Sequence, residues 1–490
     1  MLIFALAILS FVLYTTTQST TSDAAPSTTI TASQTAVTMS STPKYVVAHF
    51  MVGNTYPYTI ANWKSDISLA HASGIDAFAL NVGSDSWQPQ QIANAYSAAL
   101  QSGTDFKLFM SFDMSSLPCG SADDAGTLRN YITTYASHPN QFIYNGRVFA
   151  STFAGESCTF GQSSVSKGWS TQFTKHPALT GSNAVYFMPS FFVSPSDFST
   201  FGDVMDGAFN FNSGWPIEVN TSFVNSVVSS LHQLAPDAAP STTNILSKFV
   251  GATATDAQYL SALSSMGGQR TYMGAVSPWF FTHYSPQTYD KNWIYLSDDH
   301  LYAARWESLI NIRDQIDIVE IVTWNDYGES HYIGPVEGAQ PNSQAWVDGF
   351  DHTGWLNMTS YYAAAFKNGS YPQITKDQLI MWSRPHPANA TAPDAVGRPA
   401  NYQLTQDKLW AVVMATGQCT VTLATSSSQS QTFNVSAGIT KLSIDIEAGG
   451  YMHGLIERNG EIQVDLQPGN FTFNPNPSSY NFNAFVVASP

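Results

Sequence analysis

Short runs of β-branched and aromatic residues alternate with longer stretches of helical period from residue 45 to about residue 368, a pattern typical of repeated βα units. The runs predict eight strands, at residues 45–51, 77–82, 106–112, 148–152, 185–190, 207–211, 271–277 and 318–323. Helices are predicted at residues 60–73, 89–102, 125–137, 257–266 and 297–315. Eight strands in βα order favour a closed (β/α)8 TIM barrel over an open doubly wound sheet, and no GxGxxG sequence follows the first strand to indicate a dinucleotide site.

The pattern changes after residue 368, where Pro, Asn and Ala cluster and short alternating runs follow at residues 408–415, 420–424 and 441–446. Alternation with period two predicts a small antiparallel β domain, most simply a sandwich. We therefore divide the chain into a barrel at residues 44–372 and a C-terminal β domain at residues 373–490. Trp382 and Trp410 in this domain suit a sandwich core better than a sugar-binding face.

The first fourteen residues, MLIFALAILSFVLY, form an apolar run of signal-peptide length that is too short to span a bilayer. We predict a signal peptide at residues 1–22 and a Ser/Thr-rich disordered linker at residues 23–43. Six N-glycosylation sequons begin at Asn220, Asn357, Asn368, Asn389, Asn434 and Asn470. These features predict a secreted protein of the extracellular space or cell wall, with no stable membrane insertion.

Charge is scarce and mostly negative: charged residues make up 11% of the chain, aromatic residues 13%, and the net charge is −16. Such a surface repels nucleic-acid phosphates, so no nucleic-acid partner is expected. Hydroxyl and amide side chains together with many aromatic rings suit a neutral, hydroxyl-rich ligand such as a carbohydrate. A secreted protein without any ligand would have the same composition. We expect the protein to be a monomer.

Three cysteines leave at least one without an intramolecular partner. Cys119 and Cys158 lie in polar loops after successive predicted strands, so a disulfide between them is expected in an oxidising compartment. Cys419 lies in a strand-like hydrophobic segment and is expected to be buried and free.

The loop WNDYGESHYIGP, which follows the last predicted strand, places two carboxylates, Asp326 and Glu329, three residues apart among aromatic residues. In a barrel, the residues that follow the strands meet at one rim and form the active site. Other polar or aromatic residues in this position are Asn54, Tyr56, Asn81, Asp85, Trp87, Asp113, Glu156, Trp215, Trp279 and His283. Amides, carboxylates and indoles at one rim suit a saccharide cleft, although each residue could instead cap a helix or form a turn, and for Asp85 a turn is equally expected.

Cleavage of a glycosidic bond needs one carboxylic acid to protonate the leaving oxygen and a second carboxylate to attack carbon or activate water. The candidates are Asp113, Glu156, Asp326 and Glu329. This chemistry needs no metal or other cofactor, and the chain has no HExxH zinc motif. It also lacks the GxSxG sequence of serine hydrolases.

These segments resemble glycoside hydrolase family 71, the fungal α-1,3-glucanases or mutanases. The resemblance rests on residues 46–59, 74–88, 106–115, 148–156, 276–283, 322–335 and 349–355. It implies endo-hydrolysis of α-1,3-glucan, a fungal cell-wall polymer, with inversion, on a barrel with an appended β domain. It also implies that Asp326 and Glu329 are the essential carboxylates and that Asp113 is a third acidic residue important for activity.

We expect Asp326 and Glu329 to share the acid and base roles, with Glu329 favoured as the acid because it reaches farther and would pack against Trp324 and Tyr327. The expected substrate-binding residues are Asn54, Tyr56, Asn81, Asp85, Trp87, Glu156, Trp215, Trp279, His283, Trp324, Asn325, Tyr327 and His331. For the two histidines a structural role is equally expected. The alternatives are a hydrolase of another neutral glycan and a non-catalytic protein that binds cell-wall carbohydrate.

Overall fold

The computed structural model describes residues 43–234 and 241–490. The predicted signal peptide and all but the last residue of the predicted linker lie outside these residues. None of the helices in the described part of the chain has the length and apolar character needed to cross a membrane.

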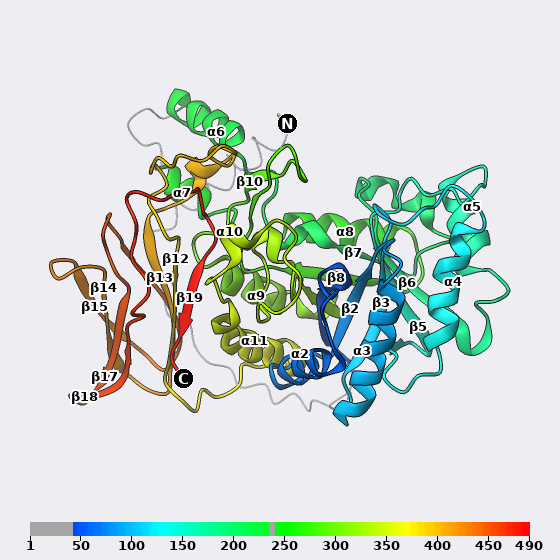
Figure 1. The fold of residues 1–490 in the computed structure, drawn as a ribbon, viewed down its shortest axis with the longest axis horizontal. Helices are drawn as coiled ribbons and strands as arrows, with labels where there is room; N and C mark the ends of the chain where they lie inside the picture. The colour runs from blue at the N-terminus through cyan, green and yellow to red at the C-terminus, as the bar shows by residue number, and fades with distance from the viewer. Residues whose placement is uncertain (1–42, 235–240) are drawn as a thin grey trace, which may run out of the picture.

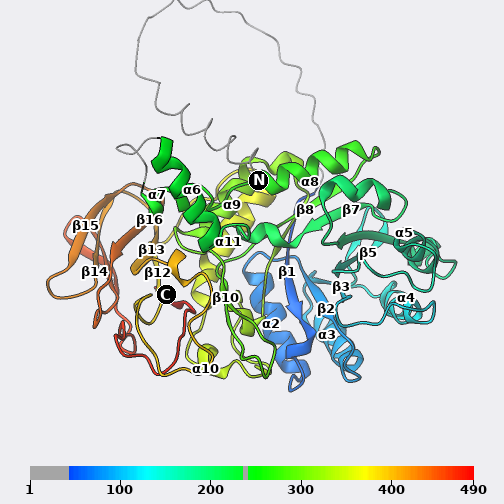
Figure 2. The same ribbon diagram turned by 90° about the horizontal axis from the view of Figure 1, so that it is seen from above.

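The larger part of the molecule is built on a curled sheet of parallel strands surrounded by helices (Figure 1). The parallel strands are β1 (Tyr45–Met51), β2 (Ala77–Val82), β3 (Lys107–Asp113), β5 (Arg147–Phe153), β6 (Val185–Ser190), β7 (Gly207–Asn210), β8 (Thr271–Val276) and β11 (Ile318–Ile321). They pair in the order β6-β5-β3-β2-β1-β11-β8-β7, and β4 (Ile143–Tyr144) forms a short hairpin with β5. Seen from the second direction, the sheet curves around its own interior (Figure 2).

The eight predicted strands are confirmed in position and order. Three of them have the predicted bounds, and the others differ by one or two residues. The largest difference is at the end of β11, which stops at Ile321 because the backbone N–H of Thr323 donates instead to the carbonyl of His331, 2.9 Å away. The polar loop therefore begins two residues earlier than the hydrophobic pattern indicates.

Helices cover the outer face of the curled sheet. The helices are α2 (Ile60–Ala72), α3 (Gln88–Ser102), α4 (Asp124–Tyr135), α5 (Val165–Trp169), α6 (Thr221–Leu234), α7 (Thr242–Leu246), α8 (Ala254–Ser265), α9 (Leu301–Asn311), α10 (Gln344–Val347) and α11 (Leu356–Asn368). Of these, α6 and α7 lie away from the curled sheet and pack with Leu296 and Leu404. The prediction missed α6 and α11 and the short helices α5, α7 and α10. It also began α9 four residues too early, because the carboxylate of Asp298 binds Arg384 (2.7 Å) and the N–H of Gln406 (2.6 Å) in the C-terminal part of the chain rather than capping a helix.

Alternate residues of the parallel strands enter two different cores, as the pleat of a strand requires. In β1, Val46, Ala48 and Phe50 pack beneath the helices, whereas Val47 packs with Met273 and other residues inside the curled sheet. His49 therefore also faces the interior, close to the axis of the sheet.

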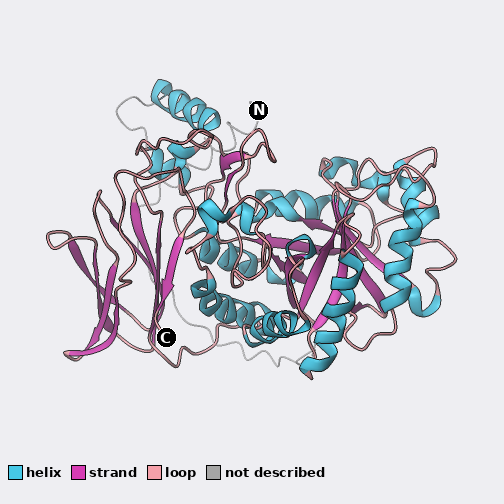
Figure 3. Cartoon of the chain, viewed as in Figure 1, coloured by secondary structure: helices cyan, strands magenta, loops and turns pink. Residues whose placement is uncertain are grey.

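The C-terminal part of the chain forms two antiparallel four-stranded sheets (Figure 3). The inner sheet has the order β16 (Gly438–Asp445), β13 (Lys408–Ala415), β12 (Gln378–Ser383), β19 (Phe485–Ala488), and the outer sheet β15 (Ser430–Val435), β14 (Cys419–Ala424), β17 (His453–Arg458), β18 (Glu461–Leu466). Leu379 and Leu409 of the inner sheet share one core with Val421 of the outer sheet, as in a sandwich. The other face of the inner sheet, with Trp382 and Trp410, belongs to the core of the larger part. The β domain is therefore packed against the helices of the curled sheet over one whole face.

Two smaller features complete the fold. Strands β9 (Phe281–His283) and β10 (Asn292–Ile294) form a hairpin in the long loop after β8. A disulfide joins Cys119 to Cys158, linking the loops after β3 and β5, and Cys419 is a buried free thiol.

Candidate active site

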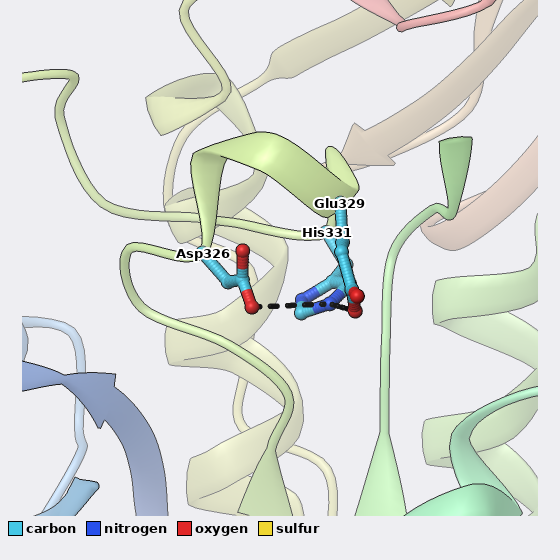
Figure 4. A group of neighbouring side chains, drawn as sticks. All are labelled: Asp326, Glu329 and His331. Atoms are coloured by element: carbon cyan, nitrogen blue, oxygen red, sulfur yellow. Dashed lines mark hydrogen bonds and ion pairs between the residues drawn. The ribbon is translucent and has the colours of Figure 1, made fainter. Parts of the chain in front are cut away.

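The loop after β11 brings Asp326 and Glu329 to the same side of the chain (Figure 4). Asp326 caps a single 3-10 turn, Tyr327–Glu329, and Ser330 then ends the turn in the left-handed region with φ 61°. The turn brings both carboxyl groups to one imidazole, since Nε2 of His331 lies 4.0 Å from Asp326 and 3.0 Å from Glu329.

The start of this loop is fixed to the end of β1 by a buried amide. The side chain of Asn325 accepts a hydrogen bond from the N–H of Met51 (2.7 Å) and donates one to the carbonyl of Met51 (3.1 Å). Asn54 donates to the backbone carbonyl of Asn325 (2.9 Å), and the hydroxyl of Tyr327 donates to the carbonyl of Pro335 (2.9 Å). Asn54, Asn325 and Tyr327 therefore hold the backbone that carries the two acids.

Glu329 is held by two donors. The ammonium of Lys291 donates to its Oε1 (2.8 Å), and Nε2 of His331 donates to its Oε2 (3.0 Å). His331 is completely buried, and its Nδ1 lies 3.1 Å from Oγ1 of Thr323. Since that oxygen already accepts the N–H of Asp326 (2.8 Å), the hydroxyl proton is available for Nδ1, which leaves the ring proton on Nε2 to bind Glu329.

The two carboxyl groups differ in charge environment although about a fifth of each side chain is exposed, 21% for Asp326 and 20% for Glu329. Burial and the neighbouring charge of Glu329 raise the pKa of Asp326. Burial would also raise the pKa of Glu329, but the hydrogen bond from His331 and the charge and hydrogen bond of Lys291 outweigh it and hold that pKa below its usual range. Asp326 therefore holds a proton more firmly than Glu329 does.

The carboxyl groups line a cavity of about 150 Å³ at the carboxyl ends of the strands. Its walls are formed by Met51, Asn54, Tyr284, Tyr289, Lys291, Asp326, Tyr327, Gly328, Glu329, Pro341 and Ser343. Tyr289 is more than half exposed, so an aromatic ring stands at the mouth of this cavity. Charge at the bottom and rings at the opening suit a sugar chain, which offers hydroxyl groups and flat C–H faces.

An oxygen of Asp326, an oxygen of Glu329 and a ring nitrogen of His331 lie within 4.8 Å of one another, a spacing that a metal ion could bridge. However, the ammonium of Lys291 already contacts Glu329 and supplies positive charge at this point. We therefore assign no metal to the cluster.

The other two candidate acids lie apart from this pair. Asp113, at the end of β3, is half-buried and accepts hydrogen bonds from the N–H (3.0 Å) and hydroxyl (2.5 Å) of Ser115. Glu156, after β5, accepts one from the N–H of Phe192 (3.2 Å). Among the described residues, no hydrogen bond or ion pair joins either carboxylate to Asp326 or Glu329.

Three predicted binding residues lie on the rim after β1 and β2, and a fourth lies beneath them. Tyr56 is 69% exposed, and its ring meets the half-buried ring of Trp87 edge-on at 5.4 Å. Asp85 is exposed and accepts a hydrogen bond from Gln88 (3.0 Å) in the turn that begins α3. Asn81 is buried near the end of β2, in register with Met51.

The predicted indole ligands are largely inside the protein. Trp324 is fully buried against Phe78 (5.2 Å). Trp279 donates its N–H to the carbonyl of Phe482 (2.9 Å), and Trp215 donates its N–H to the carbonyl of Trp279 (2.8 Å). Trp215 also packs against the ring of His331 at 5.3 Å, so it supports a residue of the site from behind.

His283 is also engaged within the protein. Its Nδ1 lies 2.8 Å from Asn292 and its Nε2 lies 2.9 Å from Asp394, a residue of the C-terminal part of the chain. Both ring nitrogens therefore have partners that hold the hairpin of β9 and β10 in place.

The sequence reasoning missed Lys291, Tyr284 and Tyr289, which all come from the loop around the β9–β10 hairpin. Lysine is scarce in this chain, and Lys291 stands in the aromatic stretch TYDKNWIY after the seventh barrel strand. That context was the available signal, but its partner Glu329 lies 38 residues later and could not be read from it.

The comparisons with known proteins agree with one another. The model of glycosyl hydrolase family 71 matches residues 42–490. The chain is 38% identical over 459 residues to a glucan endo-1,3-alpha-glucosidase of Schizosaccharomyces pombe, covering 92% of this chain and 96% of that one. It is 33% identical over 449 residues to a mutanase of Penicillium rubens, covering 90% and 88% of the two chains.

Two further matches were found. An ascus wall endo-1,3-alpha-glucanase of S. pombe is 31% identical over 457 residues, covering 90% of this chain and 96% of that one. Among solved structures, the GH99 endo-alpha-mannosidase of Bacteroides thetaiotaomicron aligns with a TM-score of 0.42 and 11% identity over 67% of this chain and 99% of that one.

Proposed function

The chain belongs to glycosyl hydrolase family 71, and on that premise we propose that it is an endo-acting hydrolase of α-1,3-glucan. The observation that carries the proposal is the pair of Asp326 and Glu329 beside His331 at the carboxyl ends of the strands, with the pKa of Asp326 raised and that of Glu329 lowered. Three relatives covering at least 90% of the chain carry α-1,3-glucanase, α-1,3-glucosidase or mutanase names, and two of those names specify endo action.

We expect the purified protein to release reducing sugar from insoluble α-1,3-glucan but not from β-1,3-glucan or chitin offered at the same mass. Early products should be a mixture of oligosaccharides if cleavage is internal. Release from a different polymer alone would replace the substrate assignment. Binding to α-1,3-glucan without any release would favour a carbohydrate-binding protein instead.

In the proposed mechanism, Asp326 is the general acid, and Glu329 is the carboxylate that attacks carbon or activates water. This reverses the division favoured on side-chain length. Glu329 is the longer side chain, but Lys291 and His331 stabilise its charge, whereas Asp326 accepts no hydrogen bond on its carboxyl group among the described residues. A group that keeps its proton near neutral pH is suited to protonate the leaving oxygen.

We propose inversion as the stereochemical outcome, following the resemblance of the sequence. An inverting pair needs its carboxyl groups about 6.5–9.5 Å apart to admit a water molecule, whereas about 5–5.5 Å suits a covalent intermediate. The nearest oxygens of Asp326 and Glu329 lie within 4.8 Å. This is the shortest separation in the pair, and inversion requires the two carboxyl groups to admit a water molecule when the glucan chain enters.

The outcome is read directly by proton NMR during the first minutes of hydrolysis. Inversion gives new reducing ends that appear first as the β-anomer and then mutarotate. First appearance of the α-anomer would contradict inversion, would fit the short spacing of the pair, and would leave the hydrolase assignment intact.

We also propose that the curled sheet closes as a (β/α)8 barrel of residues 44–372, with residues 373–490 as the appended β domain. β6 and β7 are the two ends of the paired series, and Asp206, just before β7, connects them. Its N–H donates to the carbonyl of Phe187 in β6 (2.8 Å), and its carboxylate accepts the N–H of Phe187 (2.9 Å). Secretion and the monomeric state stay predictions from the sequence.

A further inference from the structure

A buried ionisable pair lies inside the curled sheet beneath the acid pair. Nδ1 of His49, on β1, is 2.7 Å from Oε1 of Glu320, on the neighbouring strand β11. The side chains are 1% and 0% exposed. A carboxylate in the middle of the apolar run IVEIV is costly to bury, so its presence calls for a role or a compensating charge.

The chemistry of the pair fixes which atom carries a free proton. Burial favours the electrically neutral form of the pair, which is either an imidazolium with a carboxylate or a neutral imidazole with a carboxylic acid. In both forms the proton between Nδ1 and Oε1 is shared, and Nε2 of His49 carries the other proton. Among the described residues, Nε2 of His49 and Oε2 of Glu320 have no hydrogen-bond partner. The pair therefore has a positive end at His49 and a negative end at Glu320.

The strand register directs the positive end toward the active site. Glu320 is aligned with Val47, and His49 lies two residues farther toward the carboxyl end of β1, where the loop with Asp326 begins. The N–H of Trp324 donates to the backbone carbonyl of His49 (2.7 Å), so the loop starts on His49 itself. In line with this placement, the charge of His49 lowers the pKa of Asp326, against the larger effects of burial and of Glu329, which raise it.

We propose that His49 and Glu320 are positioning residues, in which Glu320 orients His49 so that its positive end sets how firmly Asp326 holds the catalytic proton. This rests on the proposed role of Asp326 as general acid. The other ionisable groups that act on Asp326 are Glu329, His331 and Lys291 of the active site, with the phenol of Tyr284 beside them. The ring of His49 otherwise meets the uncharged ring of Phe211 at 5.4 Å.

The test is the pH profile of kcat/KM on soluble α-1,3-glucan oligosaccharides for His49→Phe. The alkaline limb reports loss of the proton from the general acid. Removing the positive end of the pair should raise the pKa of Asp326, so the limb should move to higher pH by roughly half to one unit. A purely structural role for His49 would lower activity at every pH without moving the limb.

The double variant H49F/E320Q keeps a ring and a polar side chain but leaves no unpaired buried charge, so it carries the test if the single variant does not fold. Its limb should move by the same amount as that of H49F, because both remove one dipole. The matched control is Ser151→Ala, which deletes a neutral interior hydrogen bond to the carbonyl of Met188 (2.7 Å) and should leave the limb where it is.

A folded variant whose alkaline limb does not move, or moves to lower pH, would overturn the proposal. Failure of both variants to fold would also overturn it, because the pair would then be assigned to stability alone. In each of these cases the wild-type enzyme would still hydrolyse α-1,3-glucan. Failure of the proposed function would give a different result, because the wild-type protein would then release no sugar from α-1,3-glucan.

Discussion

Replacing Asp326 by Asn is expected to lower the rate of α-1,3-glucan hydrolysis by roughly 10²–10⁴-fold, the usual contribution of a general acid. Asn has the shape of a protonated carboxyl group but cannot give up a proton to the leaving oxygen. Burial and the charge of Glu329 already favour the neutral form of Asp326, so the substitution leaves the charge balance of the folded site nearly unchanged. Reducing-sugar release and thermal unfolding, measured on the same preparation, check both parts.

The thermal midpoint of Asp326→Asn should be close to that of the wild type, because Asn replaces a carboxyl group whose neutral form burial and the charge of Glu329 already favour. Asp314→Asn is the matched control, since it makes the same chemical change on a side chain that is 98% exposed. Near-full hydrolysis by Asp326→Asn would contradict the assignment. A large fall in the thermal midpoint would show that Asp326 is structural.

Replacing Glu329 by Gln is expected to abolish hydrolysis to a similar extent, with a loss of roughly 10²–10⁴-fold. The amide can neither attack carbon nor take a proton from water, and it also removes the charge that pairs with Lys291 and His331. Binding should survive better than turnover, because the cavity keeps its shape. Isothermal titration with an α-1,3-glucan oligosaccharide, compared with the hydrolysis rate, separates the two effects.

The cost of Glu329→Gln in unfolding free energy should be small, about 1 kcal/mol, since the side chain of Lys291 is 43% exposed and can be hydrated after its partner is lost. Glu447→Gln, an exposed position of the C-terminal domain, controls for the change in net charge. Added formate should restore part of the activity to the Gln variant if only the carboxylate is missing. Full activity without formate would exclude Glu329 from the chemistry.

The alternation of short apolar runs with helical stretches was sufficient to locate the strands. A buried parallel strand is a continuous apolar run, which can be recognised without information from distant residues. β1, β2 and β6 have the bounds that the pattern predicts. Helix ends were harder, because distant partners compete with local caps. The carboxylate of Asp298 could have begun α9 but binds Arg384, a residue 86 positions later.

The candidate site was read from local order, and the tertiary structure sorted its members. Position after a strand correctly indicated the acidic loop, but it could not tell which aromatic residues face a ligand. Trp279 and Trp324 follow strands, yet they are buried, because the β domain and the helices cover the places where they lie. Tyr56 and Trp87, which follow β1 and β2, form an aromatic pair on the rim.

The sequence by itself determined the order of the strands, the loop that carries the two carboxyl groups and the family to which the chain belongs, because each depends on residues close together in the chain or on a matching motif. Only the tertiary structure shows that the two carboxyl groups differ in pKa. Glu329 is bonded to Lys291, which lies 38 residues earlier in the chain, and to His331, whereas burial raises the pKa of Asp326. A pKa responds to charge and burial within a few ångströms, and folding alone brings those groups together.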